Sequence, residues 1–404
     1  MSTSLLYHGF GINGYQYVRT IYRKGKIIFC IIPKAFSLRC PICGSKRVKR
    51  RGTKTRMFRT IPIGLKSVFI QIPIQRIECL CCNVIRQVKI KFAEWRRSYT
   101  KAFERYALAL SKHMTILDVA NHLGVSWDTI KDIQKRYLAK KYKRPRLKNI
   151  TRIAIDEISI GKGHRYLTVV LDLKTGAVIF VGDGRGVDSL KPFFKRLKYS
   201  KAEIKAVAID MSPSYIAAVL ENLPDSTIVF DHFHVIKLLN DNLSELRRAI
   251  HREAEGPLQK KVLKGTRWLL LKNSYNLNEQ KNEKERLEEA LSLNKPLATA
   301  YYLKEDLRQV WSQVCKSDAK TVLTDWIKKA QSTGIAILQK FAKTLAGHAF
   351  GILNYYDYPI STGPLEGTNN KIKTLQKQAY GYRDMDFFKL KIYGLHEARY
   401  ALVG

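Results

Sequence analysis

The chain has 404 residues, of which 45% are hydrophobic, so it is long enough for about two or three domains with buried cores. Lysine and arginine number 72 against 34 acidic residues, which leaves a formal net charge of +38. An excess of this size predicts a polyanionic partner, with nucleic acid as the first candidate. No apolar run approaches the roughly 18 residues of a membrane span, and the start lacks the pattern of a signal peptide. We therefore expect no membrane partner and a reducing cytoplasmic or nucleoid location.

Five of the seven cysteines fall into two tight groups. In a chain without a secretion signal, such grouping favours metal ligation over disulfides. Two C-x-x-C pairs supply four sulfurs for a tetrahedral structural Zn²⁺, and they are Cys40, Cys43, Cys79 and Cys82. Cys81 is an alternative fourth ligand, ranked below Cys82. The interval 44–78 is long for a zinc ribbon, and a β-hairpin inserted between the pairs explains it.

Residues 1–100, which contain these cysteines, are predicted to form a zinc-ribbon DNA-binding domain. Short β-type runs at 26–32 and 68–74 predict strands. A basic loop at 46–56 is expected between the cysteine pairs.

Residues 101–148 change to a helical pattern and predict a helix-turn-helix DNA-binding domain. One short helix ends at Gly124, and the next begins at Ser126, a residue type favoured at helix N-caps. In this layout the last helix reads the major groove, and its outward side chains are expected to be Asp128, Lys131, Gln134 and Lys135, the last three as DNA-binding residues. A generic three-helix packing unit is the alternative, but the basic runs on either side favour DNA binding.

Residues 149–404 are predicted to form an α/β catalytic domain. The pattern gives three strands, at 152–160, 165–173 and 177–182, and then alternates helix and strand twice more before a long helix. This order predicts a ribonuclease-H-like mixed sheet with helices on both faces. Residues 240–355 carry little β signal and predict an all-α insertion.

Two acids stand where apolar runs stop, a pattern typical of buried strands. Asp156 ends one run and Asp210 ends another, so we expect both at the carboxyl edge of the sheet, where open α/β sheets place ligands. Glu157 follows Asp156 directly, and its side chain should point to the other face of the strand. We therefore exclude Glu157 from direct metal ligation.

Glu366 is the predicted third acid, on a helix near the end of the chain. At 100° per residue it shares one face with Asn370, Lys373 and Lys377, which are candidate DNA-binding residues, while an apolar stripe lies opposite. Mg²⁺ or Mn²⁺ prefers oxygen ligands, and a pair of such ions catalyses phosphodiester cleavage. Asp156, Asp210 and Glu366 are therefore predicted as the catalytic magnesium ligands.

An acid-x-x-His pair follows the next strand. Asp231 and His234 can meet at the junction of that strand with a helix, where His234 would orient a catalytic group or contact the scissile phosphate. We expect both to be accessory catalytic residues. Whether Asp231 takes the place of Asp210 as the second metal ligand stays open, with Asp210 preferred because it ends the fourth strand.

Together these motifs resemble DDE transposases of the ISL-three type (ISL3-like) insertion-sequence group, which are related to Mutator-like and IS256-like enzymes. The resemblance covers essentially the whole chain. It rests on the two cysteine pairs, the helix-turn-helix, Ile155-Asp156-Glu157 with Gly163-His-Arg-Tyr166, Ala208-Ile-Asp210-Met, Asp231-His-Phe-His234 and Gly363-Pro-Leu-Glu366-Gly-Thr-Asn-Asn. It implies a ribonuclease-H-like core with a helical insertion, and metal-dependent DNA cleavage and strand transfer by Asp156, Asp210 and Glu366.

The expected partners are the double-stranded terminal inverted repeats and the target DNA. Because two element ends must be held together, at least a homodimer is expected on DNA. A DNA-binding regulator without catalysis, or another nuclease of the same fold, is the alternative. The regulator has no need of the three acids, and the amino-terminal DNA-binding modules favour transposition over the nuclease.

Overall fold

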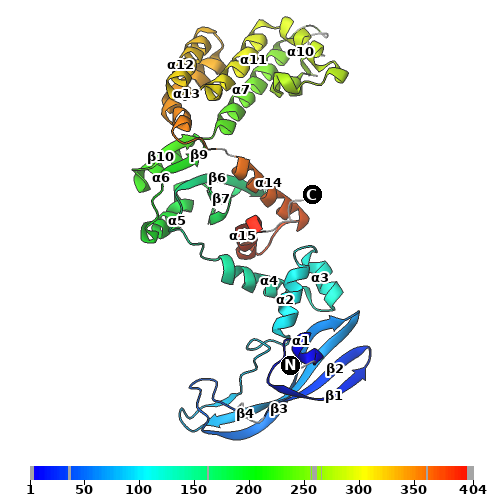
Figure 1. The fold of residues 1–404 in the computed structure, drawn as a ribbon. Coiled ribbons are helices and arrows are strands. Elements are labelled where there is room, and N and C mark those ends of the chain that lie inside the picture. The colour runs from blue at the N-terminus through cyan, green and yellow to red at the C-terminus, as the bar shows by residue number, and fades with distance from the viewer. Residues whose placement is uncertain are drawn as a thin grey trace. The chain divides into compact units, whose positions relative to one another are not determined.

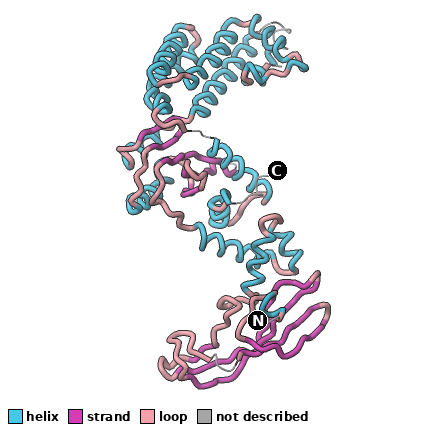
Figure 2. The backbone as a smooth tube through the Cα atoms, viewed as in Figure 1, coloured by secondary structure: helices cyan, strands magenta, loops and turns pink. Residues whose placement is uncertain are grey.

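The computed structural model describes residues 4–34, 38–161, 163–254, 256, 262–264, 266–360 and 363–397. Contacts divide the chain into two compact units, Met1–Lys143 and Arg144–Glu397. Figures 1 and 2 show a mainly β region and a small helical region in the first unit, and a sheet with many helices in the second. Each unit is described in turn.

The first unit is built on a five-stranded sheet in which β1, β2, β4 and β3 follow one another, and β5 pairs with β4. The strands are β1 (Tyr15–Arg23), β2 (Lys26–Pro33), β3 (Val48–Ile63), β4 (Lys66–Cys79) and β5 (Ile85–Gln87), preceded by the short helix α1 (Leu5–His8). β3 and β4 form the long antiparallel hairpin expected between the cysteine pairs. Alternate residues of β4, such as Val68 and Ile70, fill the core of this sheet.

The basic stretch expected as a loop is part of a strand instead. Residues 48–56 belong to β3, and the pairing register with β4 shifts between Arg50 and Thr53. Gly52 lies between them with a φ of +86°, a conformation that glycine adopts without strain. Because β3 is a hairpin partner of β4, its backbone pairs even where its side chains are basic and exposed.

The helix-turn-helix prediction is confirmed. The helices are α2 (Lys101–Leu110), α3 (Ile116–Leu123) and α4 (Trp127–Tyr142). α3 ends at Gly124 with a φ of +58°, and the Ser126 side chain accepts a hydrogen bond from the Thr129 N–H at the start of α4. The three helices enclose a small core that contains Phe103 and Ile130.

The second unit contains a mixed sheet with the strand order β10-β9-β6-β7-β8. The strands are β6 (Arg152–Gly161), β7 (Arg165–Asp172), β8 (Val178–Asp183), β9 (Ala206–Ile209) and β10 (Thr227–Phe230). β6, β7 and β8 form an antiparallel meander, while β9 and β10 run parallel to β6. This is the ribonuclease-H-like topology that the sequence predicted.

Helices lie on both faces of this sheet. α5 (Val187–Ser200) and α6 (Pro213–Asn222) share one face, because Ser189 and Tyr215 both contact Thr168 on β7. α14 (Gly363–Gln378) lies at the other face, where it contacts Asp156 on β6, and α15 (Met385–Tyr393) adjoins β8. The chain therefore brings its last helices back to β6, the first strand of this sheet.

The predicted insertion is helical. Between β10 and α14 the described residues form no strand, and the helices are α7 (His232–Glu253), α9 (Arg267–Leu271), α10 (Glu283–Ser292), α11 (Lys295–Arg308), α12 (Lys316–Ser332) and α13 (Ala336–Leu353). α13 approaches β10 so closely that a Cβ at Gly351 would lie 2.5 Å from the Phe230 ring. One core thus joins the insertion to the sheet.

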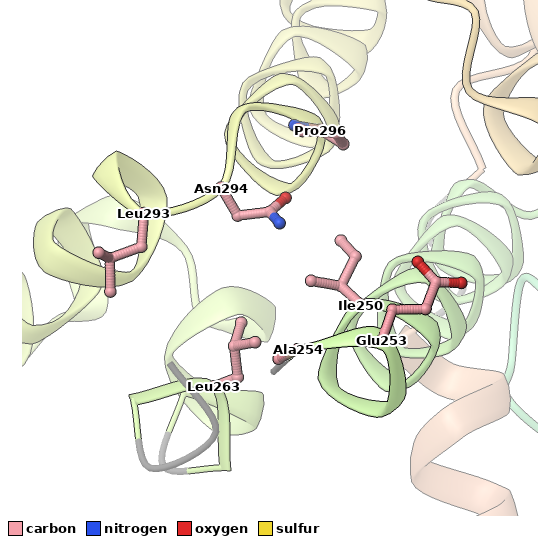
Figure 3. Close-up of a pocket in the computed structure, with 7 residues that line it drawn as sticks. All are labelled: Ile250, Glu253, Ala254, Leu263, Leu293, Asn294 and Pro296. Atoms are coloured by element: carbon pink, nitrogen blue, oxygen red, sulfur yellow. The ribbon is translucent and has the colours of Figure 1, made fainter. Parts of the chain in front are cut away.

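A cavity of about 250 Å³ lies within the insertion. Its lining comes from α7, the start of α11 and the connections that follow α7 and α10, and Figure 3 shows Ile250 and Asn294 pointing into the space. None of its lining residues comes from the strand edge that carries the predicted acids. Among the described residues, no helix is long and apolar enough to cross a membrane.

Candidate active site and metal cluster

The four predicted zinc ligands form a cluster in the first unit. The hairpin register sets Val48 opposite Cys79, so the loop before β3 meets the loop after β4. The Sγ atoms of Cys40 and Cys82 lie 3.6 Å apart, and those of Cys43 and Cys79 lie 3.5 Å apart. All four Sγ atoms lie within 4.8 Å of one another, as the ligands of one tetrahedral ion must.

The surroundings of the cluster lower the pKa of Cys79 and of Cys40, whereas burial and the neighbouring sulfurs raise the pKa of Cys82 to about 12. The Cys81 and Cys82 N–H groups donate to the Cys79 sulfur, which lowers its pKa to about 6. Cys81, the alternative ligand, lies outside the cluster, where its exposed thiol is 3.1 Å from the Ser45 hydroxyl. The chemistry of the donor set therefore fits a structural zinc ion held by Cys82 and not by Cys81.

The predicted outward face of α4 needs one correction. Asp128 is exposed, and Lys131 and Lys135 are half-buried, but Gln134 is buried with 4% exposure. Gln134 follows Ile130 by four residues, so it shares the inward face of the helix with this core residue. Our expectation that Gln134 faces outward was therefore wrong, whereas Lys131 lies over the exposed Trp127 ring.

Three aspartates lie on one row of the second sheet: Asp210 and Asp231 directly follow β9 and β10, whereas Asp156 lies within β6, which continues to Gly161 beyond the expected strand end. The register pairs Ala154 of β6 with Ala208 of β9, so two residues further Asp156 is level with Asp210. It also pairs Ile209 with Phe230 of β10, so Asp231 is level with Asp210 on the other side. Neighbouring strands are about 4.8 Å apart, so the sheet itself brings the three side chains together.

Asp156 is a buried acid with few compensating charges. It is 8% exposed, and burial raises its pKa, as does the negative charge of Asp210. His234 and two hydrogen bonds act in the opposite direction. The Glu157 N–H donates to Oδ1 at 2.8 Å, and the Asn369 amide donates to Oδ2 at 2.6 Å. The site therefore concentrates negative charge in a place shielded from water.

Asp231 and His234 meet as the sequence predicted. Asp231 is the N-cap of α7, where Oδ1 accepts from the Phe233 N–H at 2.8 Å and Oδ2 lies 2.9 Å from Nδ1 of His234. This hydrogen bond raises the pKa of His234, burial lowers it, and the charges of Asp156, Asp231 and Asp210 raise it. His234 is thus a partly buried imidazole whose protonated form is stabilised by the neighbouring acids.

Glu366 lies on α14. The face predicted to be polar is exposed at all four of its positions, which are Glu366, Asn370, Lys373 and Lys377. Leu365 and Ile372 are buried on the opposite side. The carboxylates of Asp156, Asp210 and Glu366 do not form a close ligand set; among the described residues only the four cysteines do. Glu366 instead precedes Asn369 by three residues, less than one helical turn from the contact with Asp156.

The sequence analysis missed Asn369. It contacts Asp156 directly, and its own Oδ1 is buried without a hydrogen-bond partner among the described residues. The available signal was its position, because Asn369 follows Leu365 by four residues and precedes Ile372 by three, so it is a polar residue on the apolar stripe. A buried amide on such a stripe needs a polar partner.

Family models match three stretches of the chain. Residues 153–392 match a model described as a transposase of the DDE type of the ISL3 group. Residues 88–138 match the helix-turn-helix domain of transposase family ISL3, and residues 37–82 match the zinc-finger of transposases IS204, IS1001, IS1096 and IS1165.

Two curated relatives are similar over most of their length. The transposase for insertion sequence element IS1001 of Bordetella parapertussis is 34% identical over 367 residues, which are 89% of this chain and 89% of the relative. The transposase for insertion sequence element IS1557 of Mycobacterium tuberculosis is 30% identical, over 89% of this chain and 86% of the relative.

A solved structure, the Drosophila P element transposase strand transfer complex, matches 77% of this chain and 94% of its own with a TM-score of 0.43 and 13% identity. The assignment rests on the family models and the curated relatives, which agree with the cysteine cluster, the helix-turn-helix and the acidic strand edge. The chain belongs to the ISL3 family of insertion-sequence transposases.

Proposed function

We propose that this transposase binds the terminal inverted repeats of its element and cleaves and transfers DNA strands with Asp156, Asp210 and Glu366 as ligands of Mg²⁺ or Mn²⁺. The observation that carries the proposal is the row of aspartates on adjacent strands, together with the contact from α14 to Asp156. Two adjacent strands and a helix that contacts one of them carry these three acids, which are distant in the sequence, and this arrangement supports the proposal.

The residues present fit divalent cations. Oxygen donors are the ligands that Mg²⁺ takes, and burial and like charge raise the pKa of Asp156, so a nearby cation would stabilise its ionised form. When bound, such ions supply activation of the attacking oxygen and stabilisation of the leaving one. Asp156 would lie between Asp210 and Glu366 as the shared ligand.

Asp210 is the better candidate than Asp231 for the second ligand. Asp231 already has two other roles, because its carboxylate caps α7 at the Phe233 N–H and is hydrogen-bonded to the imidazole of His234. Asp210 accepts a hydrogen bond at Oδ1 from the Ser212 N–H, at the turn into α6. We therefore assign Asp231 to hold His234, which is placed to donate a proton or a hydrogen bond to a phosphate oxygen.

The remaining parts of the proposal concern DNA and assembly. We propose three domains: a zinc-ribbon domain over 1–100, a helix-turn-helix domain over 101–148 and a catalytic domain over 149–404. The first two would bind element ends, with Lys131 and Lys135 on the recognition helix. Because two ends react together, a homodimer or larger assembly is proposed on DNA, with the bacterial nucleoid as its location.

Substituting Asp156→Asn tests the proposal. Because it removes the shared ligand, cleavage of DNA carrying an element end should fall on the order of 10³-fold in Mg²⁺, while DNA affinity is kept. Asp225→Asn is the matched control, since Asp225 is exposed in the turn before β10, at the opposite edge of the sheet. Undiminished cleavage by Asp156→Asn would refute the assignment, and wild-type binding without any cleavage would favour a regulator.

A further inference from the structure

The loop Gly184-Arg185-Gly186, called here the 184–186 loop, is anchored by buried hydroxyl groups. Thr168 of β7 donates to the Gly184 carbonyl at 3.0 Å, and Ser189 donates to the Gly186 carbonyl at 2.6 Å. The Gly186 N–H donates to the Tyr215 hydroxyl oxygen at 3.4 Å. Thr168, Ser189 and Tyr215 are 0%, 6% and 2% exposed. Buried polar groups that are paired in this way hold a loop in one arrangement.

The glycines of this stretch are required by the geometry. Gly184 and Gly186 have φ angles of +82° and +87°, which other residues rarely adopt. At Gly182 a Cβ would lie 2.4 Å from the Ser189 carbonyl oxygen. The repeated glycines therefore let β8 turn tightly into α5, and Arg185 is the one long side chain in the 184–186 loop.

The same hydroxyl network reaches the acidic strand edge. Tyr215 donates to Oε2 of Glu157 at 3.5 Å, and Glu157 follows Asp156 in β6. Burial raises the pKa of Glu157, and the charge of Asp210 adds to this, whereas the positive charge of Arg185 acts against it. Because Tyr215 contacts both Gly186 and Glu157, and Glu157 adjoins Asp156 in β6, the 184–186 loop lies close to the candidate active site, on the face of β6 opposite to the Asp156 side chain.

Arg185 is exposed, and its guanidinium N–H groups can donate hydrogen bonds to a ligand. Its guanidinium carbon lies 4.9 Å from the centre of the Tyr166 ring. Among the described residues it makes no hydrogen bond and no ion pair. Contact with a ring uses the flat face of a guanidinium and leaves its N–H groups in the plane available.

We propose that Arg185 binds a backbone phosphate of the DNA strand at the candidate active site and so positions the strand for reaction. The acids of the strand edge repel a phosphate, and an arginine with open donors beside them offsets this repulsion by a charge-assisted hydrogen bond. Arg185 is thus a positioning residue and not a catalytic one. The location of the reacting acids in this inference rests on the proposed function, whereas the position of Arg185 rests on the contacts of the 184–186 loop.

The test measures binding of the full chain to a duplex that carries an element end, with Ca²⁺ in place of Mg²⁺ to fill oxygen-ligand sites. In a set of probes, each phosphate near the end is replaced in turn by a neutral methylphosphonate. For the wild type, we expect one replacement to weaken binding roughly tenfold, as the loss of one charged hydrogen bond does. In Arg185→Ala, that replacement should have no further effect.

The variants supply two more readouts. Arg185→Ala should lower the slope of log affinity against log salt by about 1, and Arg185→Lys should keep the slope. Lys198→Ala, which removes an exposed cation from α5, the helix that follows the loop, is the control and should keep the phosphate effect. An unchanged effect in Arg185→Ala, or no sensitive phosphate in the wild type, would overturn the proposal. These readouts need no cleavage, so they stand apart from a failure of the catalytic assignment.

Discussion

The cysteine cluster and the acidic strand edge are two candidate metal sites built in different ways. The cysteines lie in two loops that a single hairpin brings together, and their sulfurs already lie within 4.8 Å of one another. The acids come from β6, β9 and α14, and only Asp156 and Asp210 share a row of the sheet. One site is closed by local pairing, whereas the other depends, in our proposal, on a helix from the end of the chain.

The difference follows from the chemistry of the ligands. Thiols can pack together as neutral groups, because each is a weak donor and acceptor. Carboxylates repel one another, and here burial and the charge of Asp210 raise the pKa of Asp156. A structural site can therefore be formed in advance, while a catalytic acidic site keeps one ligand exposed and open to substrate.

The largest expected effect comes from removing a ligand of the cysteine cluster. Structural zinc contributes about 10–16 kcal/mol of binding free energy in small domains, far more than their stability. Cys79→Ser should therefore lose the zinc and the fold of the hairpin base, and binding to element-end DNA should fall with it. Zinc content and near-ultraviolet circular dichroism measure this. Cys81→Ser is the control and should keep its zinc. Loss of zinc from this variant would show that Cys81 is a zinc ligand and would contradict the assignment of Cys82.

A smaller effect is expected from removing a hydrogen bond at the acidic strand edge. Asn369→Ala removes a hydrogen bond that favours the charged form of Asp156, so the pKa of Asp156 should rise further. Cleavage near neutral pH should fall about tenfold, with the acidic limb of the pH–rate profile moved to higher pH. Gln378→Ala is a matched control, because Gln378 is an exposed amide at the end of the same helix. Equal profiles for the two variants would count against a role for Asn369.

The smallest effect concerns His234. Its pKa is raised above the ordinary 6.5, chiefly by the hydrogen bond with Asp231. A raised pKa means that the folded chain holds the proton more tightly, so this stabilisation is complete below pH 6.5 and is lost as the pH rises through the folded-state value.

For the metal-free chain, the difference in unfolding free energy between wild type and His234→Ala should therefore shrink from about pH 6 to about pH 8. The change is expected to be about 0.5–1.5 kcal/mol, the size of one hydrogen bond. Urea unfolding measures it, with the exposed His164→Ala as the control. A difference that grows with pH would contradict a raised pKa for His234.

Much of the fold was predictable because local patterns agreed with it. The apolar run before Asp210 became β9, the run before Asp156 became the first half of β6, which continues to Gly161, and the glycine after α3 and the serine before α4 lie at their predicted caps. The exception is the basic stretch 46–56, where side-chain charge suggested a loop. Backbone pairing with β4 decided its structure, and charge on an exposed strand face does not oppose such pairing.

Long-range contacts were less predictable. Helical periodicity placed Glu366 and Lys373 on one face of α14, but it could not tell which residue of the buried stripe meets Asp156. Gln134 shows the same limit, because helical periodicity alone does not tell which side of α4 packs on the small core. For the 184–186 loop the glycines indicated only a turn, since its anchoring hydroxyls come from three separate elements.

The central claim is that Glu366 joins Asp156 and Asp210 around divalent ions when DNA is bound. Calorimetric titration of Mn²⁺ into the full chain with element-end DNA tests it, with Glu366→Gln, Asp210→Asn and the exposed control Glu221→Gln. We predict that the first two variants lose about tenfold or more in Mn²⁺ affinity, or lose an ion, while Glu221→Gln matches the wild type. Mn²⁺ binding by Glu366→Gln equal to that of the wild type would contradict the account.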